Sequence, residues 1–314
     1  MSISLGGKVA IVTGSGAGLG AAYAKALAAA GAAVVVNDVS EPAAAAIVAE
    51  IEAAGGRATA VVAPVGSSEV AQRLVDTAVA EFGGLDILVT NAGILRDKSL
   101  LKMTDDDFDA VIGVHLRGTF TAVRAAFSYF KEHEVRGRII AIGSPTGQRG
   151  NFGQTNYAAA KAGIVGMVRT WAIEMKKAGV TANAVIPVAA TAMTKTIPYF
   201  AAAVEATERG EAMPEFFRHG LGFGTPEDVA GLVVWLASDA AQSVTGQAIG
   251  VGGDRIQLWS HPEVVESYYH EGGWSAEDIE AELGASIQGR LQSVGEAPWP
   301  ALPPELERAQ PAAG

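Results

Sequence analysis

The sequence predicts an α/β fold: one doubly wound domain with a parallel sheet and helices on both faces. Short apolar runs rich in β-branched residues alternate with longer amphipathic stretches, and no linker interrupts this alternation. A glycine-rich loop also joins the first run to the first amphipathic stretch. We therefore expect one domain over residues 1–260, followed by a C-terminal extension over 261–314 with one or two helices.

The elements of this domain follow in order along the chain. Strands are expected at residues 9–12, 34–36, 59–62, 87–90, 138–142, 181–186 and 247–251. Helices are expected from the glycine loop to residue 31 and at 42–54, 69–82, 108–130, 156–177 and 226–237. Residues 191–224 are too long for an ordinary connection, so they are either a substrate lid or a surface insertion.

Composition excludes several classes of protein. The 314 residues are 49% hydrophobic, which is enough for a large core, and the net charge of −11 without a Lys/Arg run argues against nucleic acid or a membrane surface as partner. There are no cysteines and no apolar run of about 18 residues. The N-terminus lacks a secretory pattern, so we expect a cytoplasmic protein that acts on a small molecule.

The glycine-rich loop is typical of a Rossmann-type dinucleotide site. It follows a strand and opens a helix, and its glycines are Gly14, Gly16, Gly18 and Gly20. Such a loop lets a pyrophosphate approach the backbone N–H groups of the helix N-terminus. Asp38 follows the second strand, where a carboxylate accepts from the adenosine ribose and repels a 2′-phosphate, so NAD is favoured over NADP. A turn for the glycines and a helix cap for Asp38 are the alternatives.

Three further residues suit proton transfer. Ser144 follows the strand at 138–142 and so falls at the carboxyl end of the sheet, where ligands bind in α/β proteins. Tyr157 and Lys161 are four residues apart, on one face of a helix, and the ammonium is expected to lower the pKa of the phenol. The alternative is a chance pattern on a surface helix. No metal site is expected, because the histidines are scattered.

Together these motifs resemble the short-chain dehydrogenase/reductase family over about residues 5–255. The resemblance rests on the loop from Thr13 to Gly20, the triplet that begins at Asn91, Ser144, the Tyr-Ala-Ala-Ala-Lys motif from Tyr157, and Thr245-Gly-Gln. Segments 93–99, 114–118 and 150–157 are similar to the (3R)-hydroxyacyl-CoA dehydrogenase units of peroxisomal multifunctional enzymes and to bacterial relatives.

The resemblance implies a role for each matching position. Tyr157 would be the general acid/base, Ser144 would orient the carbonyl, and Lys161 would hold the nicotinamide ribose. His115 stands where many relatives have an asparagine that holds a relay water. The cofactor-binding residues would be Gly14, Gly16, Gly18, Leu19, Gly20, Asp38, Val65, Asn91, Ala92, Gly93, Tyr157, Lys161, Pro187 and Thr191. A homodimer or homotetramer is also implied.

The resulting hypothesis is an NAD-dependent oxidoreductase that interconverts a secondary alcohol and a ketone by direct hydride transfer. A 3-hydroxyacyl-CoA is the first choice of substrate, and a hydroxysteroid or another bulky secondary alcohol is the alternative. A non-catalytic NAD-binding protein is the rival from another class. The cations that could form a rim for CoA phosphates are Arg96, Lys98, Arg117 and Arg149.

Overall fold

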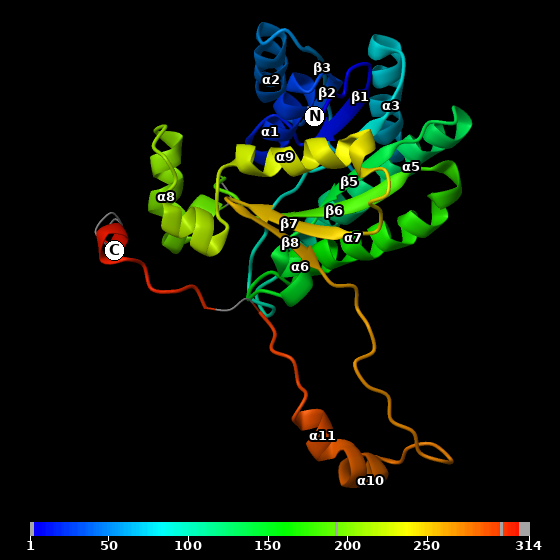
Figure 1. Cartoon of the computed structure of the whole chain (residues 1–314), viewed down its shortest axis with the longest axis vertical. Coiled ribbons are helices and arrows are strands. Elements are labelled where there is room, and N and C mark those ends of the chain that lie inside the picture. Colours follow the sequence, from blue (N-terminus) through cyan, green and yellow to red (C-terminus); the bar gives the residue numbers. More distant parts are fainter. Residues whose placement is uncertain (1–2, 192–193, 296–297, 308–314) are drawn as a thin grey trace.

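One eight-stranded sheet forms the centre of the computed structural model, which describes residues 3–191, 194–295 and 298–307. The strand order is β3-β2-β1-β4-β5-β6-β7-β8 (Figure 1). The strands are β1 (Val9–Thr13), β2 (Ala33–Asp38), β3 (Arg57–Val62), β4 (Ile87–Thr90), β5 (Arg138–Ile142), β6 (Thr181–Pro187), β7 (Ala248–Gly252) and β8 (Arg255–Trp259). The first seven are parallel, which confirms the predicted doubly wound fold.

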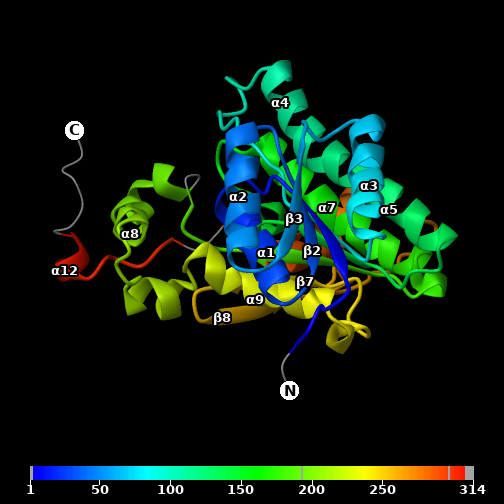
Figure 2. The same cartoon turned by 90° about the horizontal axis from the view of Figure 1, so that it is seen from above.

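Helices cover both faces of the sheet (Figure 2). One face carries α1 (Gly18–Ala29), α2 (Glu41–Ala53) and α9 (Pro226–Ala237). The other face carries α3 (Ser68–Phe82), α5 (Gly118–Glu132) and α7 (Thr155–Glu174). Each set buries its own apolar cluster against the strands, as expected for parallel strands that are apolar on both sides.

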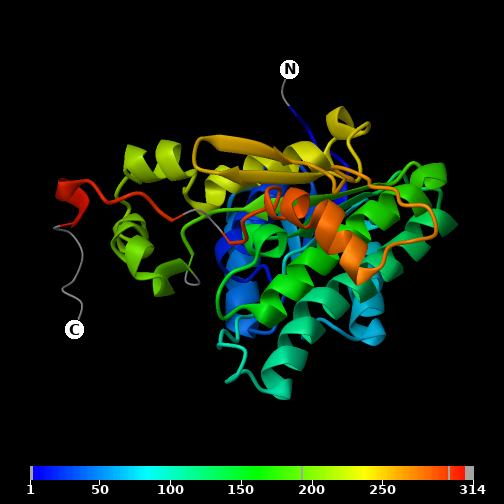
Figure 3. The same ribbon diagram turned by 90° about the horizontal axis from the view of Figure 1, so that it is seen from below.

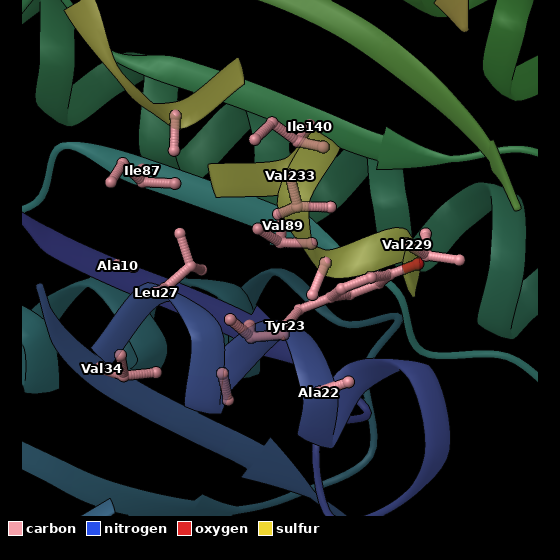
Figure 4. Close-up of a cluster of buried hydrophobic side chains, with 14 of the residues drawn as sticks. Ala10, Ala22, Tyr23, Leu27, Val34, Ile87, Val89, Ile140, Val229 and Val233 are labelled. Atoms are coloured by element: carbon pink, nitrogen blue, oxygen red, sulfur yellow. The ribbon is translucent and has the colours of Figure 1, made fainter. Parts of the chain in front are cut away.

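Helices α1 and α9 pack against each other over the first of these clusters (Figure 4). Tyr23 and Leu27 of α1 are fully buried there, beside Val229 and Val233 of α9. No described residue offers a hydrogen-bond partner to the Tyr23 hydroxyl, and burial raises the pKa of this phenol. The large apolar ring therefore offsets the cost of a buried hydroxyl without a partner.

The sheet does not end at β7, where the sequence placed its last strand. Gly253 and Asp254 form a two-residue turn, with Gly253 at φ +52, and β8 then pairs antiparallel to β7. Two-residue hairpin turns need positive φ, which glycine supplies at no steric cost. The predicted parallel sheet therefore carries one additional antiparallel edge strand, which the sequence analysis did not place.

The helices differ from their predicted bounds in two places. The stretch predicted at 108–130 begins earlier as α4 (Asp105–Ile112), capped by Thr104, and continues through a π-helical turn at Gly113–Arg117 into α5. Helix α7 ends at Glu174, and a 3₁₀ turn at Lys176–Ala178 follows it. A short helix that the sequence analysis missed, α6 (Pro145–Arg149), begins directly after Ser144.

The segments outside the repeating pattern are helical in part. Residues 198–208 form α8, and a π-helical turn spans Phe216–Leu221. The extension contains α10 (Ala276–Asp278), α11 (Gly284–Gln288) and α12 (Pro304–Glu307). Figure 1 shows α10 and α11 set apart from the sheet, and Figure 3 shows the chain returning from them towards α8. Within the described ranges, every helix is too short or too polar to cross a membrane.

Candidate active site

The glycine loop packs directly on the chain that leaves β4. Gly14 has φ +61, and a Cβ atom there would lie 2.6 Å from Cα of Ala92. The side-chain amide of Asn91 donates to the carbonyl oxygens of Thr13 (3.0 Å) and Gly14 (2.8 Å). Only glycine fits this combination of positive φ and close approach at position 14. The two hydrogen bonds from Asn91 then hold the loop in this shape.

Asp38 is the last residue of β2 and faces the same loop. Its Oδ2 atom accepts from the Gly16 N–H at 2.9 Å, and Oδ1 accepts from the Ser40 N–H at 3.0 Å. Gly16 therefore lies against Asp38 and does not line the cavity described below, whereas Asp38 does line it. This contact fixes the carboxylate at the edge of the predicted nucleotide site.

Ser144, Tyr157 and Lys161 meet where α6 packs on α7. Ser144 caps α6, its Oγ accepting from the Thr146 N–H at 3.2 Å. A Cβ atom on Gly147 would lie 2.6 Å from the carbonyl carbon of Lys161, so glycine at this position lets α6 approach the α7 backbone. Lys161 Nζ donates to the Ile142 carbonyl at 2.6 Å and lies 5.6 Å from the centre of the Tyr157 ring.

Burial has the largest effect on the pKa values of Tyr157 and Lys161. Desolvation raises the pKa of Tyr157, a hydrogen bond with Ser144 lowers it, and the charge of Asp97 raises it again. The expectation that Lys161 lowers the phenol pKa is thus not met, because burial outweighs the other effects on Tyr157. Lys161 is itself only 3% exposed, and burial lowers its pKa to about 7, so half of these side chains carry no charge near neutral pH.

His115 lies in the π-helical turn, edge-on to the Tyr157 ring at 5.2 Å between ring centres. Its Nε2 atom lies 3.0 Å from the nitrogen and 2.8 Å from the oxygen of Ile94. Burial, and then the charge of Lys161, lower its pKa to about 3. The imidazole is therefore neutral at physiological pH and does not act as a cationic acid.

A cavity of about 1790 Å³ joins these groups. Apart from Gly16, every predicted site residue lines it: Gly14, Gly18, Leu19, Gly20, Asp38, Val65, Asn91, Ala92, Gly93, His115, Ser144, Tyr157, Lys161, Pro187 and Thr191. Of the four rim cations, Arg149 also lines it. The others make contacts elsewhere: Arg96 with the Leu95 carbonyl, Lys98 with Asp107, and Arg117 with the Gly66 carbonyl.

Two polar residues that interact with Tyr157 were missed by the sequence analysis. Asn156 is fully buried; its amide donates to the carbonyls of Arg96 (3.2 Å) and Asp107 (3.1 Å), and its Oδ1 accepts from the Tyr157 N–H. Asp97 lines the cavity and accepts from Gln154 at 2.7 Å. Asn156 stands directly before Tyr157 in the first turn of α7, and its side chain ties that turn to the backbone at Arg96 and Asp107.

The glycine side of the cavity fits a dinucleotide. Gly18 has φ +53 at the N-terminus of α1, and a Cβ atom there would meet nothing nearer than Cγ2 of Thr191, at 3.9 Å. Thr191 bonds in turn with Thr194, whose hydroxyl donates to the Ala189 carbonyl at 3.0 Å. Open space beside a helix N-terminus is what a pyrophosphate needs.

The family model for short chain dehydrogenases matches residues 8–200 of this sequence. The chain belongs to the short-chain dehydrogenase family. As a member, it is an oxidoreductase that uses a nicotinamide cofactor. The family assignment confirms the resemblance inferred from the motifs, and the cofactor class agrees with the open glycine side of the cavity.

Individual members of the short-chain dehydrogenase family are similar over most of the chain. Hydroxyacyl-CoA dehydrogenase ChsB1 of Mycobacterium tuberculosis is 41% identical over 91% of this chain and 90% of its own length. Peroxisomal multifunctional enzyme type 2 of Mus musculus is 41% identical over 76% of this chain but only 31% of its own length. A crystal structure of a short chain dehydrogenase from Mycobacterium avium has a TM-score of 0.79 and 37% identity, covering 93% of this chain and 98% of its own.

Replacing Lys161 with methionine should make the cofactor-free dehydrogenase more stable. The folded pKa of about 7 lies below the ordinary lysine value of 10.5, so between these pH values the unfolded chain holds a proton that the folded protein lacks. The free energy of unfolding of the wild type therefore rises with pH from about 7 to 10.5, and the cost of the buried charge is complete below pH 7. Lys161→Met should be stabilised by more than about 1 kcal/mol at pH 6, with a smaller gain at pH 10.

Urea unfolding at pH 6, 8 and 10 measures this difference. Lys25→Met, at an exposed lysine paired with Glu50, is the control and should change stability by less than about 0.5 kcal/mol at each pH. If Lys161→Met is less stable than wild type at pH 6, the hydrogen bond to Ile142 outweighs the cost of burial and the prediction is wrong.

Proposed function

We propose that this short-chain dehydrogenase is NAD-dependent and interconverts a secondary alcohol and a ketone, with a 3-hydroxyacyl-CoA as substrate. The observation that carries the proposal is the single cavity shared by Ser144, Tyr157 and Lys161 with the glycine loop and Asp38. The names of two relatives support the substrate class, since ChsB1 is a hydroxyacyl-CoA dehydrogenase and the multifunctional enzyme matches through one part of its length.

The chemistry follows from where protons can be held. The nicotinamide, when bound, supplies the hydride acceptor for alcohol oxidation and the donor for ketone reduction. Tyr157, whose pKa is raised by burial, keeps its proton at neutral pH and can donate it to a ketone oxygen. The Ser144 hydroxyl stands beside the phenol and would hold the same oxygen by a hydrogen bond.

Alcohol oxidation makes the opposite demand, because Tyr157 has to accept a proton. A nearby positive charge favours the phenolate, and the Lys161 nitrogen lies 5.6 Å from the centre of the Tyr157 ring. In this direction the protonated state of Lys161 is the active one. Since burial lowers its pKa to about 7, cofactor hydroxyls that hydrogen-bond the ammonium would favour this state.

The preference for NAD is proposed from Asp38. Its carboxylate lines the cavity and is fixed by two backbone N–H groups, so it cannot easily turn away from a ribose. A 2′-phosphate placed there would meet a negative charge. The size of the cavity also suits a hydroxysteroid or another bulky secondary alcohol, which is the second candidate substrate class.

A substrate panel with NAD and NADP side by side tests the proposal. We expect oxidation of 3-hydroxyacyl-CoA thioesters, with kcat/KM for NAD at least about tenfold above that for NADP. Asp38→Asn keeps an oxygen for the Gly16 N–H but removes the charge, and should reduce that ratio. A wild-type preference for NADP would contradict the role of Asp38. Turnover of hydroxysteroids alone would replace the thioester by the second candidate.

A further inference from the structure

The far end of the C-terminal extension forms part of the cavity wall. We infer that the described residues 294–295 and 298–306, here called the strap, close the substrate side of the cavity and select for substrates with a bulky apolar acyl group. Val294, Gly295, Pro298, Trp299 and Pro300 line the same cavity as Tyr157. The inference rests on the proposed function for its substrate class, whereas the position of the strap is independent of it.

The strap is bonded to the protein body at two points. The Gly295 N–H donates to the Arg149 carbonyl at 2.7 Å, and the Tyr199 hydroxyl donates to the Pro300 carbonyl at 2.7 Å. Arg149 ends helix α6, which begins after Ser144, and Tyr199 lies in the first turn of α8. The strap is therefore anchored to the C-terminal end of α6 at Gly295 and to α8 of the predicted lid at Pro300.

Aromatic packing makes the second anchor a substantial one. The Trp299 ring stacks on Tyr199 at 4.9 Å between ring centres and meets Phe200 edge-on at 4.9 Å. Leu302 and Leu306 pack against the cluster that contains Phe200 and Phe217. Such aromatic pairs add to the stability that comes from the apolar area they bury. The strap and α8 therefore form one packed unit.

The surface that this unit turns to the cavity is apolar. Trp299 is 44% exposed in spite of its two ring contacts, and it borders the cavity together with Ile197, Phe200, Leu221, Phe223 and Pro298. An apolar wall of this kind stabilises alkyl or ring carbons and offers nothing to a phosphate. A short acyl group that does not reach it gains nothing from Trp299, whereas a bulky acyl group does, and this difference is the basis of selection.

Trp299→Ala tests the inference, with Trp274→Ala as the matched control because Trp274 lies in the same extension but does not line the cavity. The full chain is assayed with NAD on 3-hydroxybutanoyl-CoA and on 3-hydroxyhexadecanoyl-CoA. We expect Trp299→Ala to lower the ratio of long-chain to short-chain kcat/KM at least about tenfold, mainly through KM. Trp274→Ala should change that ratio less than about twofold.

A second measurement does not depend on substrate. Hydrogen exchange of the α8 amides should become at least about tenfold faster in Trp299→Ala, with α9 unchanged. If both thioesters lose activity equally, or if the variant matches the control in the assay, selection by the strap is overturned. If the wild type turns over neither thioester, the proposed function fails. In that case faster exchange of α8 in Trp299→Ala still supports the packing of the strap on α8, and unchanged exchange overturns it.

Discussion

Replacing Tyr157 with phenylalanine should lower kcat by about three orders of magnitude. The phenol is the group that lies beside both the Ser144 hydroxyl and the Lys161 ammonium in the cavity. Phenylalanine keeps the ring, and with it the edge-on contact with His115, so the surroundings should be retained. The dissociation constant for NADH should stay within about threefold of wild type, because the change removes one hydrogen-bonding group at most.

Tyr23→Phe is the control for this experiment. It removes the same hydroxyl from a tyrosine buried under α9, where that hydroxyl has no partner among the described residues, and should leave kcat unchanged. Steady-state rates and fluorescence titration with NADH give the two readouts. Tyr157→Phe with a kcat within about tenfold of wild type would exclude the phenol as the acid/base and favour a non-catalytic NAD-binding role.

Gly20→Ala should weaken cofactor binding and the fold together. A Cβ atom on Gly20 would overlap the Gly14 carbonyl oxygen and lie 2.5 Å from Nδ2 of Asn91, so neither backbone nor amide can yield without moving the loop. We expect a loss of about 2 kcal/mol in the free energy of unfolding. The dissociation constant for NADH should rise about 100-fold, equivalent to about 2.7 kcal/mol.

Gly166→Ala provides the comparison, because nothing lies within 4 Å of a Cβ atom there and the residue is inside α7. Alanine should keep or raise stability by up to about 1 kcal/mol, with NADH binding unchanged. Chemical unfolding and NADH titration measure both variants. Equal behaviour of the two would show that the loop tolerates a side chain at Gly20, contrary to the packing described.

The strands and most helices could be predicted because the burial of each element determines which of its own residues must be apolar. A parallel strand buried on both faces must be apolar throughout, as in the run from Val9 to Val12, and each such run is bounded by turn residues. The signal for β8 was also present: Gly253-Asp254 is a hairpin pair, and Ile256 and Leu258 alternate with polar residues. Both Ile256 and Leu258 are exposed, so the stretch lacked the continuous apolar run of the buried strands.

Parts of the cavity that lie close together in the sequence could be predicted, whereas contacts between residues far apart in the sequence could not. Ser144, Tyr157 and Lys161 lie within one short stretch, so their spacing alone indicated a shared site. The hydrogen bond from Tyr199 to Pro300 joins residues 101 positions apart, and no local pattern reports it. Helical spacing likewise predicted that Lys161 lies beside Tyr157. It did not predict how deeply both side chains are buried, and this burial shifts both of their pKa values.

The place of the strap in the sequence, at residues 294–295 and 298–306, has a consequence for how the pocket is assembled. The sheet, the glycine loop and the proposed catalytic residues all precede residue 260, so the core of the molecule can form before the strap is in place. Among the residues that line the cavity, Trp299 and its neighbours are the last in the sequence. A molecule without the strap would therefore keep the sheet and its two apolar clusters while presenting a different pocket, so an intact sheet is no guide to an intact pocket in this dehydrogenase.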